Sequence, residues 1–138
     1  MKRFFLFLTL LLVPLTVSAA SFQAGNAVDV QTNGNAYAAG SLVQVSSDAR
    51  GDVYLVGETV QINARIYEDA MLAGETITIN APINDDLHAF GAKVMLNDAV
   101  RGDVIIFGQQ VLVAPESRVT GSAVIGAETV VSQGRFDS

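Results

Sequence analysis

Cysteine and tryptophan are absent from the 138-residue sequence, histidine occurs once, and eight basic residues stand against 14 acidic ones. Without cysteine the chain can form no disulfide bond, no thiolate metal site and no lipidated cysteine. The acidic excess disfavours nucleic acid as a partner, because a polyanion repels an acidic surface and no basic cluster offsets that repulsion. Packing and hydrogen bonds alone must therefore hold the fold together.

The N-terminus carries the one long apolar run. Residues 1–20 read MKRFFLFLTLLLVPLTVSAA, in which Lys2 and Arg3 precede an apolar stretch that ends in small residues. This order is typical of a secretory signal peptide, and the stretch is shorter than the roughly 20 residues that a membrane-spanning helix needs. We predict cleavage, which leaves six basic and 14 acidic residues and a net charge of −8. The expected location is the periplasm or cell surface of a bacterium, with membrane association left open.

Glycine marks a repeat of 17 residues along the rest of the chain. The repeated glycines are Gly40, Gly57, Gly74, Gly91 and Gly108. Apolar residues alternate with polar ones on both sides of each glycine, as Val53 and Leu55 and then Val60 and Ile62 do. A period of two residues indicates strands and disfavours an amphipathic helix.

A third apolar position in each repeat divides the unit into three short straight segments. This arrangement predicts an all-β, single-domain parallel β-helix of about six coils. We expect an irregular first coil or cap over residues 21–34, the solenoid over 35–134 and a C-terminal tail over 135–138. Residues 115–119 hold one or two positions more than the repeat. Equivalent residues of stacked coils then lie about 4.8 Å apart. We call each such set a column.

Two columns are expected to turn corners of the coil. One contains Asn63, Asn80 and Asn97, because asparagine tolerates the left-handed conformation and its amides can bond along the stack. The other contains the repeated glycines, which are needed either for a positive φ or because a side chain would collide with the neighbouring coil.

The aspartate column contains Asp52, Asp69, Asp86 and Asp103. Stacked carboxylates could bind Ca²⁺, but the glycine-rich nine-residue pattern of calcium-binding β-helices is missing. The favoured interpretation is that each aspartate caps a turn by accepting main-chain N–H bonds, and weak cation binding stays an open alternative. We predict no metal site and no cofactor.

Catalysis is not expected either. The single histidine, His88, shares an outward column with Tyr37, Tyr54, Met71 and Ile105, which offer no acid, nucleophile or oxyanion partner. A period of 17 is not a multiple of the six-residue repeat of hexapeptide acyltransferases, and the turns are too short for a lyase-type site on loops.

The outward columns become more apolar toward the C-terminus. The column of Gln44, Gln61 and Thr78 continues as Met95 and Leu112 and then as Val130 or Val131. Exposed apolar patches commonly mark contact sites, and the uncapped edges of a solenoid invite another molecule to add to them. These features predict end-to-end self-association.

The repeat units resemble those of the bactofilins, the polymer-forming cytoskeletal family, and their exported bacterial relatives. The likeness lies in RGDVYLVGETVQIN, EDAMLAGETITIN, DDLHAFGAKVMLN and RGDVIIFGQQVLV. It implies a right-handed β-helix that polymerises end to end without nucleotide through apolar residues of its terminal coils. The closing stretch VVSQGRFDS resembles the last coil of that family, so the resemblance makes Phe136 a candidate contact residue.

Two functions remain as predictions. The first is a non-enzymatic, self-associating scaffold at the cell envelope, with Met95, Leu112, Val130, Val131 and Phe136 as contact residues. The alternative is a monomeric β-helix that binds an envelope partner or glycan through the outward face of Tyr37, Tyr54 and His88.

Overall fold

The computed structural model describes residues 20–137. The predicted signal peptide, residues 1–20, lies outside the described residues except for Ala20. Nine strands follow one another, and no helix long and apolar enough to cross a membrane occurs in the described part. Their bounds are β1 (Ser21–Asp29), β2 (Ala36–Val45), β3 (Val53–Ile62), β4 (Ala70–Ile79), β5 (Leu87–Leu96), β6 (Val104–Val113), β7 (Arg118–Val119), β8 (Ala123–Ser132) and β9 (Arg135–Phe136).

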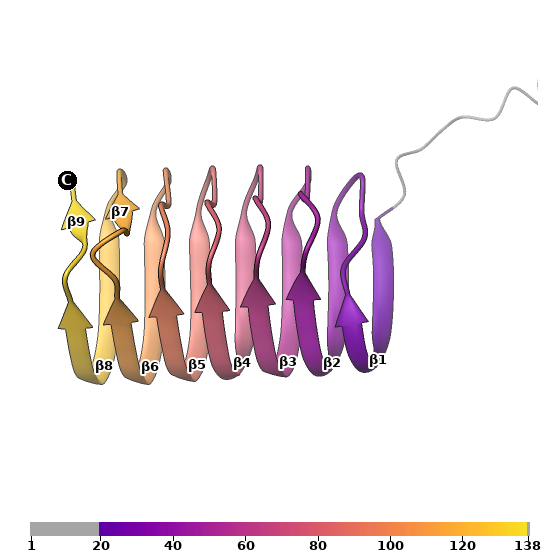
Figure 1. Ribbon diagram of the computed structural model, residues 1–138, viewed down its shortest axis with the longest axis horizontal. Coiled ribbons are helices and arrows are strands. Elements are labelled where there is room, and N and C mark those ends of the chain that lie inside the picture. Colours follow the sequence, from indigo (N-terminus) through magenta and orange to yellow (C-terminus); the bar gives the residue numbers. More distant parts are fainter. Residues whose placement is uncertain (1–19, 138) are drawn as a thin grey trace, which may run out of the picture.

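The chain winds into a β-solenoid, as the repeat predicted. Seven strands form one parallel sheet in the order β1-β2-β3-β4-β5-β6-β8, so each coil pairs with the next (Figure 1). From β2 to β6 the paired residues are 17 positions apart, as in Val53 with Ala70. The offset is 15 between β1 and β2 and 19 between β6 and β8. The short first coil still pairs along its strand, so seven coils form where about six were expected.

Each long strand bends beside the repeated glycine, so every coil has three faces. Face 1 is formed by the residues before the bend, such as 53–56, and face 2 by those after it, such as 59–62. Face 3 is held by bridges that join Ala49, Ile66, Ile83, Val100 and Val119, and by the pairing of β7 with β9. The bends line one edge of the molecule and face 3 lies along the opposite edge (Figure 1).

The interior consists of stacked aliphatic side chains. On either side of the bend, inward columns such as Val60, Ile77, Val94 and Val111 have no exposed surface. Each fully buried valine, leucine or isoleucine stabilises the fold by about 1.5–3 kcal/mol relative to leaving it exposed. Among the described residues the single buried polar one is Ser117, whose hydroxyl donates a 2.6 Å hydrogen bond to the Leu96 carbonyl.

The glycine column is required by close packing and not by an unusual backbone conformation. A Cβ atom on Gly74 would lie 2.3 Å from the Gly57 carbonyl oxygen, and Gly91 and Gly108 meet the preceding coil in the same way. No described residue has a positive φ. Of the two explanations considered for these glycines, the collision with the neighbouring coil is therefore the one that holds.

The asparagine column forms an amide ladder. Asn80 donates to Asn63 at 3.0 Å and Asn97 donates to Asn80 at 2.9 Å. The expected amide stack is confirmed, but the left-handed conformation expected for these residues is wrong, because none of them has a positive φ.

The C-terminal segment is not the free tail that was expected over residues 135–138. Arg135 and Phe136 form β9, which pairs with β7 and places Phe136 beside Val119. Arg118 donates from Nε to Asp137 at 2.7 Å and also forms an ion pair with it. The chain is therefore ordered on face 3 through the last described residue.

Candidate functional site: the C-terminal end of the solenoid

The N-terminal end of the solenoid presents the edge strand β1, and its first coil carries a polar side chain in an inward column. Gln23 lies in an inward column that is otherwise apolar, and its side-chain amide donates a 3.0 Å hydrogen bond to the Gln31 carbonyl. Val28, an inward residue of the same coil, is only 8% exposed. The first coil thus covers its own interior.

At the C-terminal end, the last described coil leaves inward side chains exposed. Val130 occupies the same inward column as Val28, since Val111 pairs with it, yet it is 45% exposed. Phe136, at the end of the inward column on face 3, is 36% exposed. Within the described part, β8 has a paired strand on one side alone, so its outer main-chain groups face away from the sheet. Apolar side chains and a free strand edge therefore coincide at this end.

The predicted contact residues fall into two groups. Met95, Leu112 and Val131 share one outward column of face 2, as the repeat predicted. Met95 and Leu112 are half-buried, whereas Val131 is exposed in the last coil. Val130 is not an outward residue of that column but an inward one, exposed because no described coil follows it. Val130, Val131 and Phe136 thus belong to the C-terminal end, and the other two lie on the side of the solenoid.

Tyr37, Tyr54 and His88 do share one outward column on face 1, with Met71 between Tyr54 and His88. The rings of Tyr37 and Tyr54 stack at a centroid distance of 4.8 Å with an interplanar angle of 6°. Because the rings stack on each other along the solenoid axis, they present edges and hydroxyl groups to solvent.

The aspartate column is a hydrogen-bond ladder between coils. Asp69 accepts the main-chain N–H of Asp86 at 2.9 Å, and Asp86 accepts that of Asp103 at 2.7 Å. In the first step of the ladder an asparagine, Asn35, takes the same role and accepts the N–H of Asp52 at 2.9 Å. The expectation that these carboxylates accept main-chain N–H bonds is confirmed, and the donors come from the following coil.

One part of this edge concentrates negative charge. Carboxylate oxygens of Asp69, Asp85 and Asp86 all lie within 4.8 Å of one another. The charge of Asp69 is the largest cause that raises the pKa of Asp85, followed by desolvation and the charge of Asp86. The carboxylates of Asp69 and Asp86 already serve as acceptors in the ladder, which accounts for their position without a cation.

A polar hollow of about 540 Å³ lies at the N-terminal end, beside the shortened first coil. Ser21, Thr32 and Asp48 are among its lining residues, and Asp48 is the single ionisable side chain there. The hollow therefore offers no pair of groups for acid–base or nucleophilic chemistry.

An apolar column on face 1 escaped the sequence reasoning. Val56, Phe90 and Phe107 stand in one outward column next to the bend, where they are 57%, 43% and 46% exposed. Phe90 and Phe107 stack with ring centroids 6.1 Å apart. The sequence does contain a sign of this column. In three coils the residue directly before the repeated glycine is large and apolar.

Comparisons of the chain with protein-family models, curated proteins and solved structures found no match.

Proposed function

We propose that this protein is a non-enzymatic scaffold that associates with itself through its C-terminal coil, at the cell envelope of a bacterium. The observation that carries the proposal is the difference between two inward valines of one column, 8% exposure at Val28 against 45% at Val130. One end of the solenoid covers its core, and the other leaves it accessible to a second molecule.

The physical basis is the combination of an apolar surface with a free strand edge. A strand edge offers main-chain donors and acceptors that a second chain can pair with, and natural proteins normally protect such edges. Here the β8 edge is accompanied by Val130, Val131 and Phe136, each between a third and a half exposed. Completing the burial of such side chains contributes about 1 kcal/mol each, in addition to the main-chain bonds.

The envelope location rests on the predicted signal peptide, and polymerisation into filaments rests on the resemblance to the bactofilins. The repeated coil supports polymerisation, because a stack of coils is extended by any molecule that continues its register. No nucleotide or other cofactor is part of the proposal.

The proposal is tested by measuring the mass of the assemblies that the chain from Ser21 onward forms in solution. This chain contains all nine strands. We expect its mass in sedimentation velocity to rise with concentration, and negative-stain electron microscopy to show filaments or sheets. Val130→Asp places a charge in the open end and should weaken association at least tenfold, which corresponds to about 1.4 kcal/mol. Gln110→Asp adds the same charge at an exposed position on face 2 and should change little.

Two results would overturn the proposal. One is a wild-type chain that stays monomeric at the highest concentration reached. The other is equal weakening by Val130→Asp and Gln110→Asp, which would assign the effect to net charge. Circular dichroism of both variants verifies that the β-solenoid is retained.

A further inference from the structure

Face 1 presents an apolar surface along the whole solenoid. Its first outward column contains Phe22, Tyr37, Tyr54, Met71, His88, Ile105 and Val124. Its second contains Ala24, Ala39, Val56, Ala73, Phe90, Phe107 and Gly126. No aspartate, glutamate, lysine or arginine occurs at these positions. Contiguous exposed apolar surface of this extent commonly marks a contact site on a protein.

Face 2 shows that the fold itself does not require such a surface. It belongs to the same seven coils and also has two outward columns, but Asp29, Lys93 and several threonine and glutamine residues interrupt their apolar residues, which are Ala27, Leu42, Met95, Leu112 and Val131. The two faces share length, strand pairing and coil geometry. The difference between them is therefore a property of face 1 and points to a partner that covers it.

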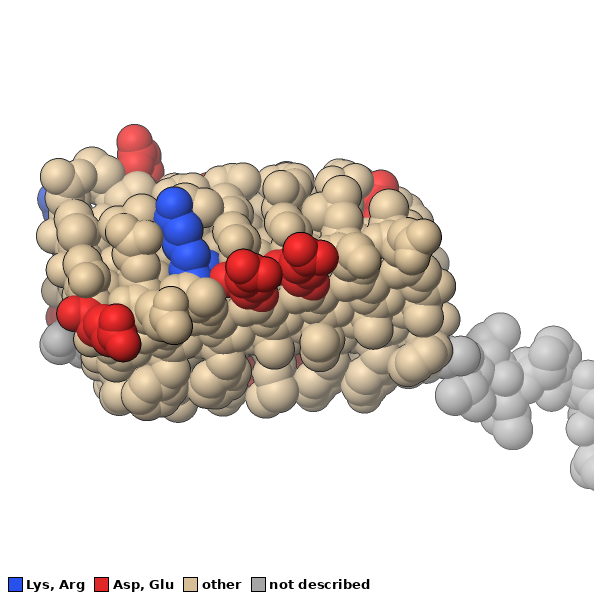
Figure 2. Space-filling view, turned by 90° about the horizontal axis from the view of Figure 1, so that it is seen from below, with Lys and Arg blue, Asp and Glu red and all other residues tan. Residues whose placement is uncertain are grey.

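Acidic groups border face 1 on both long sides. The aspartate column directly precedes its strands, and the charge of Asp52 is the largest cause that raises the pKa of Tyr54 on this face. Along the bent edge lie Glu58, Glu75 and Glu128, and Figure 2 shows acidic side chains gathered there beside a basic group. The strip is thus apolar in its centre and carries acidic groups on both borders, with neutral Ser41 before Glu58 and neutral Ala92 and Gln109 between Glu75 and Glu128 at the bend.

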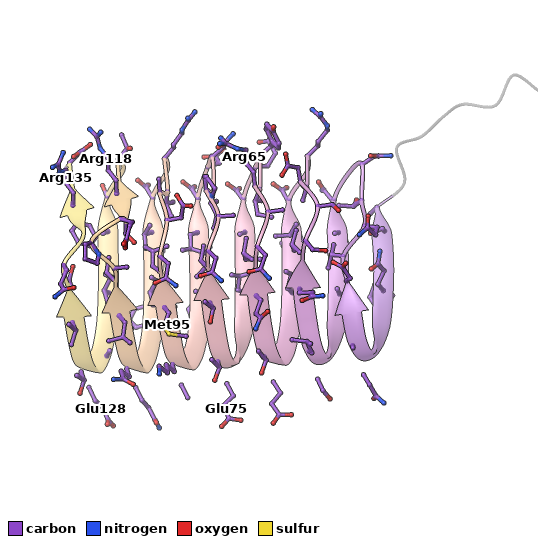
Figure 3. All side chains as sticks on the ribbon, viewed as in Figure 1. Arg65, Glu75, Met95, Arg118, Glu128 and Arg135 are labelled. Atoms are coloured by element: carbon purple, nitrogen blue, oxygen red, sulfur yellow. The ribbon has the colours of Figure 1, made fainter. Side chains whose placement is uncertain are left out.

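The arginine residues of the described part occur outside the strands of face 1. Arg50 and Arg101 each lie two residues before an aspartate of the column, and the Arg50 guanidinium lies over the Tyr67 ring, 5.4 Å from its centroid. Arg65, Arg118 and Arg135 extend from the face 3 edge, opposite Glu75 and Glu128 on the bent edge (Figure 3). None of these three arginines belongs to the bent edge, where Lys93, which pairs with Thr76 next to Glu75, is the basic residue beside the glutamates. A partner with positive charge on both sides of an apolar strip is therefore complementary to face 1.

The same borders argue against two other occupants. A second copy turned onto face 1 would bring its aspartate column opposite either the same column or the glutamates of the bent edge, and both arrangements oppose like charges. An anionic lipid surface would be repelled by both borders. Charge complementarity selects a cationic partner over either of these.

The dimensions of the strip fit a single helix. Seven strands spaced about 4.8 Å apart extend roughly 29 Å along the solenoid axis. A helix rises 1.5 Å per residue, so about 19 residues cover that length.

We propose that face 1 is a docking surface for a basic amphipathic helix of about 19 residues, which lies along the solenoid axis with its apolar side on the two outward columns. Lysine or arginine side chains on the two flanks of that helix pair with the aspartate column on one border and with Glu58 and Glu75 on the other. This contact lies on the side of the solenoid and does not depend on association at its C-terminal end.

The test uses a fluorescent 18-residue leucine–lysine amphipathic peptide and the full folded chain from Ser21 onward, in 150 mM salt. We expect saturable binding in fluorescence anisotropy. Val56→Thr combined with Phe90→Thr should weaken it at least tenfold. Leu42→Thr combined with Leu112→Thr removes apolar area from face 2 and is the matched control, which should change the affinity less than twofold. Glu58→Gln combined with Glu75→Gln should also weaken binding.

Three outcomes would overturn the proposal. The first is equal loss of binding in the face 1 and face 2 variants, and the second is equally tight binding of a leucine–glutamate peptide of the same length. The third is that the peptide does not bind at all. If the face 1 substitutions then abolish self-association, face 1 binds a second copy, and if they abolish binding to anionic vesicles, it binds a lipid surface. Circular dichroism again verifies the fold of each variant.

Discussion

Replacing Asp69 separates the hydrogen-bonding role of the aspartate column from its charge. The Asp69 carboxylate accepts the main-chain N–H of Asp86 at 2.9 Å, and it lies in the acidic group with Asp85 and Asp86. Asparagine keeps an acceptor oxygen at the same place and removes the charge. Alanine removes both.

The structure supplies the direction of each effect. Asn35 already performs the accepting role in its own coil, so Asp69→Asn should be at least as stable as the wild type. Asp69→Ala leaves the Asp86 N–H without its acceptor. Loss of such a bond at an exposed position costs about 1–2 kcal/mol, which lowers the melting temperature of a chain of this size by roughly 3–8 °C.

The pH dependence follows from Asp85, whose pKa is raised chiefly by the charge of Asp69. A raised pKa means that the folded chain binds this proton more readily than the unfolded chain does. The destabilisation by the charged Asp85 is therefore present at neutral pH, and it is relieved as the pH falls through the raised folded value toward the usual 3.8. In Asp69→Asn the pKa of Asp85 should move down and this contribution should shrink.

Thermal unfolding of the three proteins between pH 7 and pH 4, with an NMR titration of the Asp85 carboxyl, measures both effects. Equal destabilisation by asparagine and alanine would refute the hydrogen-bond account. A rise in wild-type melting temperature with millimolar Ca²⁺ that both variants lose would identify the acidic group as a cation site instead.

Two further substitutions test the packing between coils. Gly74→Ala should cost about 1–3 kcal/mol in chemical unfolding, because its Cβ would lie 2.3 Å from the Gly57 carbonyl oxygen. Gly25→Ala, where the nearest atom lies 3.8 Å away, should change stability by less than about 0.5 kcal/mol, and equal effects at the two sites would contradict the steric explanation. Ser117→Ala removes the buried hydrogen bond to the Leu96 carbonyl and should cost about 1 kcal/mol by the same measurement, whereas an unchanged or increased stability would show that this bond is dispensable.

Much of the solenoid follows directly from the spacing of residues. Since equivalent positions of successive coils become neighbours at the strand spacing, a 17-residue period identifies which residues pair, and the alternation around each glycine separates inward from outward side chains. The asparagine ladder and the shared column of Tyr37, Tyr54 and His88 were predicted on this basis. The accepting role of the aspartates was predicted from turn chemistry, as the capping of a turn, whereas their donors belong to the following coil.

Other features depend on distances and neighbours that the period does not contain. The glycines could have served a positive φ or a close approach, and only the 2.3 Å separation between a Gly74 Cβ and the next coil decides between them. The segment at Phe136 could have been a tail, and only its pairing with Val119 places it on face 3.

The 17-residue period alone specifies the coil, its register and its interior, because stacking converts a linear period into contacts between coils. The tertiary structure decided what the surface can do. Val130 and Val111 are the same residue type in the same column, and they differ only in whether another coil covers them. Likewise, the bend in each long strand decides which acidic residues flank face 1. It places the aspartate column on one side of this face and Glu58 and Glu75 on the other.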